Sequence, residues 1–414
     1  MAQEWWGRQA VVATALLVGL LAAGGPRLRG QTLLTSSGPS GVRIFNTDLA
    51  ILALQEPRRD LPCTVIPMKP VLGFDLRFHS GYEVSIPLKE LAGSENLLTM
   101  VFRVTPEGSK DEPSYFIQRV RVPAIEPDAK GEAYLQGAFD LGEGRYHIDW
   151  LMRDRSERVC SWYWDVEAEL SARDKELALT LPPGAIQPAE AEPFREEPPV
   201  ERAQDQPPLN VKVLVNFAPQ SPNAATLQPL DMAALVAILR GIAREPRISK
   251  FSVVAFNLQE QRVLYRQDRA DRIDFPRLGE ALRSLNLGTI DLKRLSERHG
   301  ETEFLTELIQ REIGGEERPD GLIFAGPKAM LEQNIPLDVL KEVGDVEYPV
   351  FYMNYNLNPH MNPWRDAIGR AVRFFRGYEY TISRPHDLWT ALNEIVMRIV
   401  RRKEALRAAG TSSQ

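Results

Sequence analysis

Polar side chains follow two apolar runs in the second half of the chain, where a ligand could bind. Asn216, Gln220 and Ser221 come after the run Val211 to Val215, and the Asn-rich segment Asn354 to Pro363 completes a later run. Amide, hydroxyl and imidazole groups give a neutral hydrogen-bonding surface that suits protein contact. The alternative is that Asn and Pro simply make turns. We predict an interaction rim of nine residues, namely Asn216, Gln220, Ser221, Thr302, Lys328, Asn354, Tyr355, Asn356 and His360.

Motifs for catalysis, cofactors or metals are absent from the sequence. It has no Walker loop, His-Glu-x-x-His, Gly-x-Ser-x-Gly or Gly-x-Gly-x-x-Gly after a strand. The five histidines have no metal-ligand spacing. We therefore expect no catalytic, cofactor-binding or metal-binding residue. The rival is an envelope enzyme with an unrecognised site, for which Thr302 and His360 are the residues to substitute.

The N-terminus predicts export. The apolar run Ala10 to Gly25 has 16 residues, fewer than the roughly 20 that span a bilayer. Small residues and Pro26 end it, as in a cleaved signal peptide covering residues 1–30. The mature chain is then secreted or periplasmic. If the segment stays uncut, the chain is instead a membrane-anchored assembly factor, and only then do we expect membrane contact.

The two cysteines gain meaning from this prediction. In an oxidising compartment Cys63 and Cys160 can pair. A disulfide that closes a loop of about 100 residues contributes about 4 to 5 kcal/mol in the chain-entropy model. Two buried free thiols are the alternative. We predict the disulfide.

Net charge argues against nucleic acid as a partner. The chain carries 50 Lys and Arg against 56 Asp and Glu, a formal net charge of -6. No global basic field therefore attracts nucleic acid. We expect one or more unidentified protein partners, no nucleic acid and no cofactor.

Residues 186–209 predict a linker between two domains. They are rich in Pro and Glu and nearly free of apolar residues, so they cannot bury enough surface to fold. Before them we expect a flexible segment at 31–60 and an antiparallel β-sandwich at 61–185, because apolar residues alternate along short strands. "FDLGEGRYHIDW" resembles a hairpin of immunoglobulin-like and fibronectin-like modules.

After the linker, apolar strands alternate with amphipathic helices. "VKVLVNF", "FSVVAFNL", "DGLIFAG", "PVFYMNYN" and "YEYTIS" read as strands, and "QRVLYRQD" follows the second so closely that it must pair with it antiparallel. Strands interleaved with helices predict a mostly parallel sheet covered on both faces. We expect this α/β, Rossmann-like domain at 210–404, followed by a tail at 405–414.

That order of elements resembles the von Willebrand factor type A (vWA) fold over about half of the chain, from Asn210 to Lys403, and it is similar to VWFA-related proteins exported by some bacteria, which carry a signal sequence and often a β-rich N-terminal region. The resemblance implies a metal site built on Asp-x-Ser-x-Ser after the first strand. In this sequence Asn216, Ala218 and Gln220 stand at those positions, and Ala325 replaces an Asp at the end of the fourth strand. Thr302 could stand for the family's Thr. Without the carboxylates nothing offsets the dehydration of Mg²⁺, so we expect a degenerate, metal-free site and a non-enzymatic interaction or scaffold protein.

Overall fold

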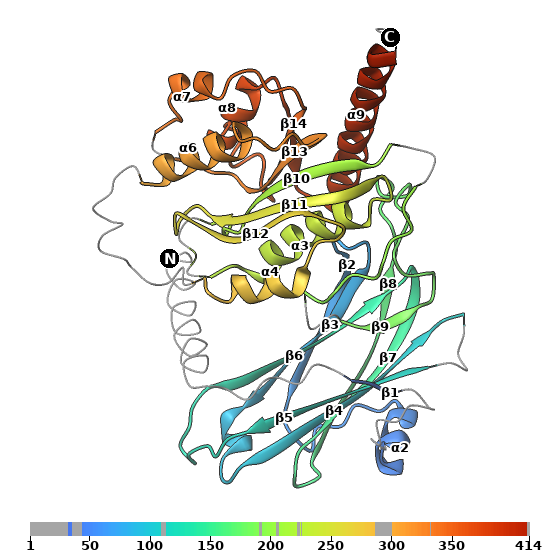
Figure 1. Cartoon of the computed structure of the whole chain (residues 1–414). Helices are drawn as coiled ribbons and strands as arrows, with labels where there is room; N and C mark the ends of the chain where they lie inside the picture. The colour runs from blue at the N-terminus through green and yellow to red at the C-terminus, as the bar shows by residue number, and fades with distance from the viewer. Residues whose placement is uncertain are drawn as a thin grey trace. The chain divides into compact units, whose positions relative to one another are not determined.

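The computed structural model describes residues 32–34, 44–108, 113–189, 193–203, 207–221, 224, 226–285, 300–331 and 333–411. The predicted signal peptide at 1–30 lies outside these residues. The described chain forms two compact units that divide near residue 191 (Figure 1). Two short segments, Leu72–Leu76 and Ser171–Ala178, group with the second unit. No helix among the described residues is long and apolar enough to cross a membrane.

Two sheets make up the first unit. One has the order β1-β5-β4-β7-β8 and the other the order β2-β3-β6-β9. The first sheet contains β1 (Thr32–Leu34), β4 (Asn96–Pro106), β5 (Ser114–Val122), β7 (Gly144–Arg153) and β8 (Val159–Ala168). The second contains β2 (Thr64–Leu72), β3 (Phe78–Pro87), β6 (Glu132–Leu141) and β9 (Ile186–Pro188), and the 3₁₀ turn η1 (Leu88–Leu91) follows β3.

Aromatic rings join the inner faces of these two sheets. Tyr82 of β3 lies edge-on to Phe102 of β4 and Trp150 of β7, with ring centroids 5.6 and 5.2 Å apart. Phe139 of β6 lies 5.7 Å from Phe102. All four side chains are fully buried. Such ring pairs add to the burial of apolar area, which is the main stabilising term of this core.

Part of the segment before β2 has regular structure, so the prediction of a flexible stretch over 31–60 does not hold for residues 32–34 and 46–54. Besides β1, it contains α2 (Asn46–Leu54), whose Ile51 and Leu52 pack into a core with β4, β5 and β7 residues. The Cys63–Cys160 disulfide is confirmed, with Cα atoms 6.3 Å apart. The apolar residues of α2 run consecutively from Leu49 to Leu54, so the sequence shows no helical period there. The sheet supplies the surface against which two of them pack.

The second unit contains a six-stranded sheet in the order β12-β11-β10-β13-β14-β15. All neighbours pair parallel except β11 and β12, which pair antiparallel at one edge. This confirms the predicted strands and the antiparallel edge. The strands are β10 (Leu209–Asn216), β11 (Ile248–Asn257), β12 (Arg262–Ala270), β13 (Gly321–Pro327), β14 (Val350–Tyr355) and β15 (Tyr378–Ile382).

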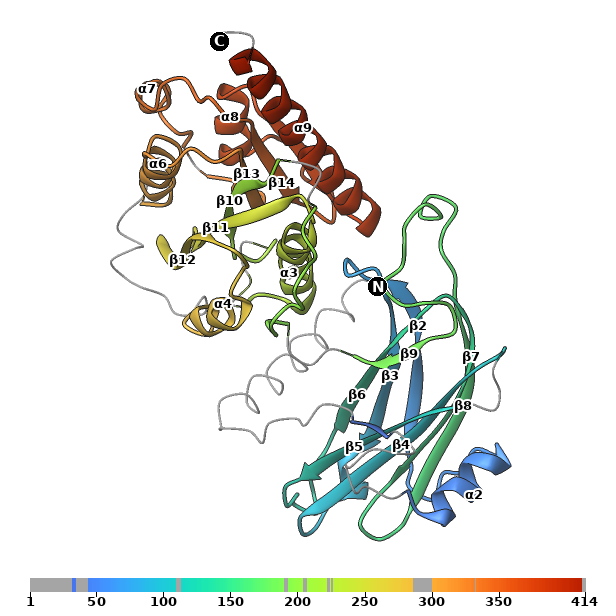
Figure 2. The same cartoon turned by 45° about the vertical axis from the view of Figure 1, so that its right-hand side comes forward.

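Helices cover both faces of this sheet (Figure 2). One core joins the sheet to α3 (Pro229–Arg244), α4 (Phe275–Leu282) and α9 (Pro385–Thr411). The other joins it to α6 (Gly300–Ile313), α7 (Leu337–Glu342) and α8 (Ala367–Phe374). Because both faces are covered, the central strands β10, β13 and β14 are buried at nearly every position.

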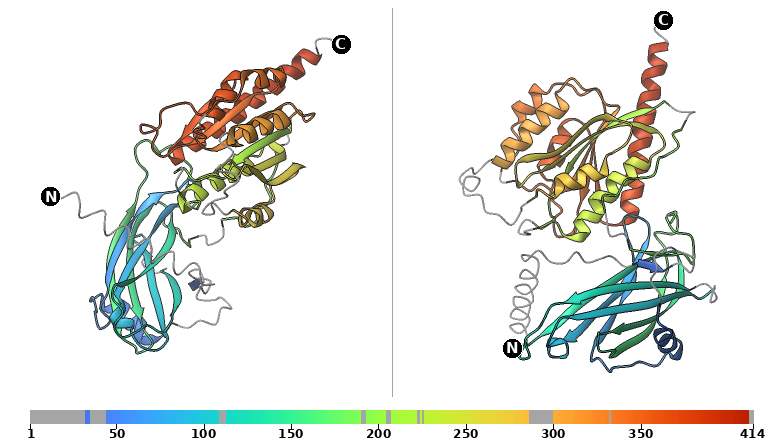
Figure 3. Two further views of the ribbon diagram at one scale, coloured as in Figure 1. Left: turned by 90° about the vertical axis from the view of Figure 1, so that its left-hand side faces the viewer. Right: turned by 60° about the horizontal axis from the view of Figure 1, so that its bottom comes forward.

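Two predicted boundaries differ from the structure. Residues 186–209 are not a free linker, because β9 pairs with β6 and the part from Phe194 packs on the second unit. Glu197 forms ion pairs with Arg240 and Arg244 at 2.8 and 2.6 Å. The predicted tail is helical through Thr411, and the last turns of α9 extend past the sheet (Figure 3). The ring of Phe194 and the carboxylate of Glu197 hold the Pro-rich segment in place, and composition alone does not predict these contacts.

Candidate interaction site at the carboxyl edge of the second sheet

The centre of the second sheet has a topological switch point. The chain leaves β10 towards β11 on one side, and it leaves β13 towards β14 on the other. In open α/β sheets such a point opens a crevice beyond the carboxyl ends of the two strands, where ligands bind. Asn216 ends β10, Gly326 lies next to the end of β13, and Asn354 lies near the end of β14.

Asn216 lies beside this switch point at the end of β10. Its side chain is buried, and its Oδ1 accepts a hydrogen bond of 3.2 Å from the backbone N–H of Leu258, just past β11. A second hydrogen bond joins the same strands, because Nδ2 of Asn257 at the end of β11 donates to the carbonyl of Phe217 at 2.6 Å. A Cβ on Gly326, which has φ +148°, would lie 2.8 Å from the Cβ of Asn216. The ends of β10 and β11 are therefore joined by two side-chain amides, and the amide of Asn216 bonds to the backbone.

Asp231, the first carboxylate after β10 in the sequence, has a structural role. It completes a capping box with Gln228 at the start of α3 and accepts from the backbone N–H of Gln228 at 3.3 Å. Burial raises the pKa of Asp231, against hydrogen bonds from the backbone of Gln228 and Gln220 that lower it. Gln220 lies half-buried with Nε2 3.5 Å from the carbonyl of Tyr355, and Ser221 is exposed.

Asn354 and Tyr355 lie on β14 with fully buried side chains. Asn354 donates from Nδ2 to Glu379 at 2.8 Å and to Thr381 at 3.2 Å on the neighbouring strand β15. The hydroxyl of Tyr355 has no hydrogen-bond partner in the described part of the chain, and burial raises its pKa. Tyr355 packs in the core with α3, α4 and α9, and Asn354 bonds to β15. Both side chains are therefore inside the unit and are not part of the surface of the rim.

The loop between β14 and α8 is held by its own asparagines. Asn356 is buried, donates from Nδ2 to the carbonyl of Asn362 at 3.2 Å and accepts from the N–H of Asn358 at 3.2 Å. Lys328 follows β13 and donates from Nζ to the carbonyls of Asn362 and Trp364 at 2.9 and 2.6 Å. Asn356 thus shapes the turn of this loop, as the alternative reading of the Asn-rich segment expects.

The same loop exposes two large apolar side chains. Met361 is 85% exposed and Trp364 is 71% exposed, and His360 between the turns is also exposed. The loop ends at Asp366, the N-cap of α8, whose buried carboxylate accepts from the N–H groups of Ala329 and Gly369 at 2.6 and 2.8 Å. Sequence reasoning missed Met361 and Trp364, although a Trp and a Met inside an Asn- and Pro-rich loop were a visible signal.

Thr302, the remaining residue of the predicted rim, lies in the first turn of α6. Its side chain is mostly buried, and Oγ1 donates to the carbonyl of Gln333 at 3.4 Å. It therefore fastens α6 to the segment before α7. Of the nine predicted residues, Asn216, Thr302, Asn354, Tyr355 and Asn356 are buried, which leaves Gln220, Ser221, Lys328 and His360 at least partly accessible.

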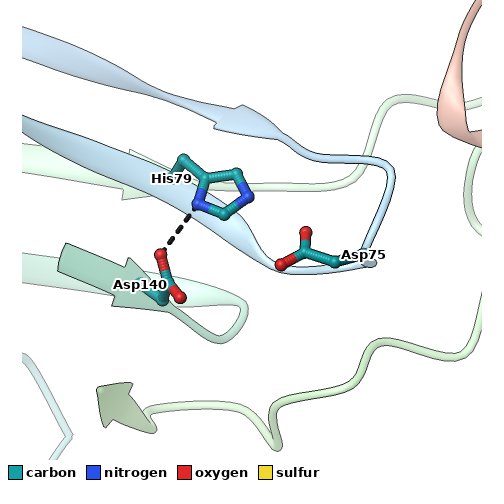
Figure 4. A group of neighbouring side chains, drawn as sticks. All are labelled: Asp75, His79 and Asp140. Carbon is teal, nitrogen blue, oxygen red and sulfur yellow. Dashed lines mark hydrogen bonds and ion pairs between the residues drawn. The ribbon is translucent and has the colours of Figure 1, made fainter. Parts of the chain in front are cut away.

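A different cluster has the residue types of a metal site. Among the described residues, one group of His, Cys, Asp or Glu side chains brings three candidate ligand atoms within 4.8 Å of one another, and it consists of Asp75, His79 and Asp140. They come from the β2–β3 turn, from β3 and from the opposite position on β6 (Figure 4). His79 Nδ1 lies 2.8 Å from Asp140, and Arg77 donates to the same carboxylate at 3.4 Å. That guanidinium already balances the buried Asp140, so the group is an ion-pair cluster.

Comparisons with known proteins do not assign a family. No protein-family model matches the chain, and no curated protein matches it. Solved structures that are similar include a Northeast Structural Genomics Consortium target, SoR45, at 12% identity and TM-score 0.18, which covers 28% of this chain and 94% of that one. A glycosyl hydrolase family 2 member from Bacteroides cellulosilyticus has 12% identity and TM-score 0.18, and 78% of this chain aligns with 39% of it. A Bacteroides uniformis β-glucuronidase has 9% identity and TM-score 0.18, with 73% and 39% covered. This chain thus spans well under half of either hydrolase, and likenesses this distant leave both its family and its activity unassigned.

Proposed function

We propose that the protein is an exported, non-enzymatic interaction or scaffold protein whose second unit is a vWA-like domain without a metal site. Its sheet has the order third, second, first, fourth, fifth, sixth along the chain, with the third strand antiparallel at the edge. This order supports the resemblance to the vWA fold. The amide at Asn216, which is occupied by the N–H of Leu258, supports a crevice that no longer binds a cation.

The observation that carries the proposal is the anchored loop with Met361 and Trp364 on its surface. Exposing a Trp and a Met costs free energy that burial against a partner would recover. Trp is enriched among the residues that dominate binding energy at interfaces, and Met adapts to differently shaped partners. Hydrogen bonds from Lys328 and Asn356 hold the loop before any partner arrives, which lowers the entropic cost of binding.

The Cys63–Cys160 disulfide is compatible with an extracellular location, because such bonds persist in oxidising compartments. Export remains the part of the proposal that rests on the N-terminal sequence. Mass spectrometry of the mature N-terminus in the native host tests it. Loss of residues 1–30 supports export with cleavage, and an intact N-terminus in the cytoplasm contradicts it.

A photo-crosslinking experiment tests the interaction site. The full chain carries benzoylphenylalanine in place of Met361 and is illuminated in its native host. We expect discrete protein adducts, and we expect them to be lost when Trp364→Ser is added. The control places the same group at Met68, an exposed methionine of β2 in the first unit. Adducts that are absent at 361, or identical from 68, contradict the proposal.

A further inference from the structure

Three arginines lie on the solvent side of helix α8 and just after its end. Arg370 and Arg373 are exposed on the helix, and Arg376 is exposed just after it. In the described part of the chain none of these three arginines forms an ion pair, and Arg370 contacts only the amide of Asn334. The protein as a whole is acidic, with a net charge of -6. A positive surface in such a chain marks a place where an acidic ligand is attracted.

Two carboxylates of the described residues around α8 are already in use. Asp366 is buried and accepts from two backbone N–H groups and from the hydroxyl of Tyr352 at 2.8 Å. Glu379 pairs with Arg365 at 3.0 Å and accepts from Asn354. Neither carboxylate neutralises the exposed arginines. Their charge is therefore available to a partner.

Packing fixes the direction of these side chains. The opposite face of α8 buries Ile368, Ala371 and Val372 in the core shared with α6 and α7. Residues three apart on a helix lie on the same side, so Arg370 and Arg373 both point to solvent. Phe374 is 38% exposed beside them, and its ring lies edge-on to that of Phe375 at 5.3 Å. Helix α8 begins at the carboxyl edge of the sheet and ends at the opposite edge, where Phe374 and Arg376 precede β15. The surface along α8 thus combines guanidinium groups with exposed aromatic rings.

We propose that this surface receives an acidic protein segment, whose carboxylates pair with Arg370, Arg373 and Arg376 while its apolar residues cover Trp364 and Phe374. The planar guanidinium donates two parallel hydrogen bonds to a carboxylate. Trp and Arg are also the side chains enriched at the centres of protein interfaces. This inference rests on the proposed function and names the chemistry of the partner.

Other anionic partners fit this surface less well. Recognition of an anionic membrane surface uses clusters of about four to eight Lys or Arg, more than the three unpaired arginines on and just after α8. Nucleic-acid binding typically uses about six to ten phosphate contacts, again more than this surface offers. A short acidic stretch of protein needs only two or three cations, together with the apolar contacts that this surface provides.

The test measures fluorescence anisotropy of labelled poly-L-glutamate titrated with the full chain at low salt. We expect saturable binding that high salt removes. The variant R370Q/R373Q should weaken it about fivefold, from two exposed ion pairs of ordinary strength. The matched control is R119Q/R121Q, which removes the same charge from two exposed arginines of β5; it should bind like the wild type. Thermal unfolding of both variants checks that the fold is intact.

Three results would overturn the inference: no binding of poly-L-glutamate, equal weakening by both variants, or arginine-dependent binding of phosphatidylserine vesicles without binding of poly-L-glutamate. The crosslinking at residue 361 separates this inference from the proposed function. If R370Q/R373Q leaves the adduct in place and poly-L-glutamate does not bind, the interaction site stands and the acidic partner falls. If no adduct forms at all, the interaction site itself falls.

Discussion

Replacing Glu312 with glutamine should strongly destabilise the second unit at neutral pH. Glu312 lies on α6 with a side chain that is 1% exposed, and it pairs with Lys212 of β10 at 2.9 Å and with Arg266 of β12. Lys212 is itself buried and has a second carboxylate partner, Glu317, at 3.0 Å. Glu312→Gln keeps the shape of the side chain and removes its charge. The buried ammonium of Lys212 then loses half of its compensation.

The pKa of Glu312 gives the size of this effect. Burial alone would raise the pKa, but hydrogen bonds from Arg266, Lys212 and Arg311 outweigh it and lower the pKa from 4.5 to about 2. A carboxyl whose pKa is lower in the folded state stabilises that state above the unfolded pKa of 4.5, and this contribution is lost as pH falls through about 2. At about 1.4 kcal/mol per pKa unit the contribution is about 3 kcal/mol at neutral pH. Breaking a buried ion pair costs a similar amount, about 3 to 5 kcal/mol.

Urea unfolding followed by circular dichroism, at pH 7 and near pH 2, measures this contribution. We expect Glu312→Gln to lower the free energy of unfolding by about 3 kcal/mol at pH 7 and by much less at the acid end. The matched control is Glu307→Gln on the exposed side of the same helix, which should stay within about 0.5 kcal/mol of the wild type. Equal losses for both variants, or a loss for Glu312→Gln that does not shrink at acid pH, would refute the reasoning.

Two further predictions concern covalent and steric constraints. Cys63→Ser with Cys160→Ser should lower the free energy of unfolding of the first unit by up to about 4 to 5 kcal/mol, because the bond closes a sequence separation of 97 residues; wild type with reductant should match the variant in denaturant titrations, and no difference would contradict it. Gly326→Ala should cost about 1 to 3 kcal/mol, because φ is +148° and the new Cβ would meet Asn216. Gly344→Ala, with φ +78° and open space around it, should cost less. Thermal unfolding of both variants measures the two costs, and an equal cost would count against the steric argument.

Strand and helix positions in the second unit were predictable because both faces of its sheet are covered. Short segments dominated by apolar residues, such as Val213 to Val215 and Leu322 to Ala325, then fit only strands buried on both faces. The short spacing before "QRVLYRQD" left only an antiparallel pairing. The segment 186–209 was not predictable in this way. Its order depends on contacts of Phe194 and Glu197 with residues far along the chain, and composition does not record those contacts.

Burial of the predicted rim was also beyond the sequence. Asn216, Asn354 and Asn356 have the composition of a surface loop, yet each is within 4% of complete burial. An asparagine has both a donor and an acceptor, so it can satisfy two backbone groups at a strand end without a counter-ion. Whether it does so depends on the register that brings the N–H of Leu258 or the carbonyl of Asn362 within reach. That register exists only in the folded sheet.

These asparagines also explain why the accessible surface lies beside the crevice. A carboxylate at position 216 would be costly to bury without a cation, whereas the amide of Asn216 is satisfied by the backbone after β11. The loop after β14 lies farther along the same edge, and hydrogen bonds from Lys328 and Asn356 hold it in place. The amides of Asn216, Asn354 and Asn356 are buried, whereas the loop after β14 exposes Met361 and Trp364. These two side chains are therefore the large apolar groups that the loop offers to a partner.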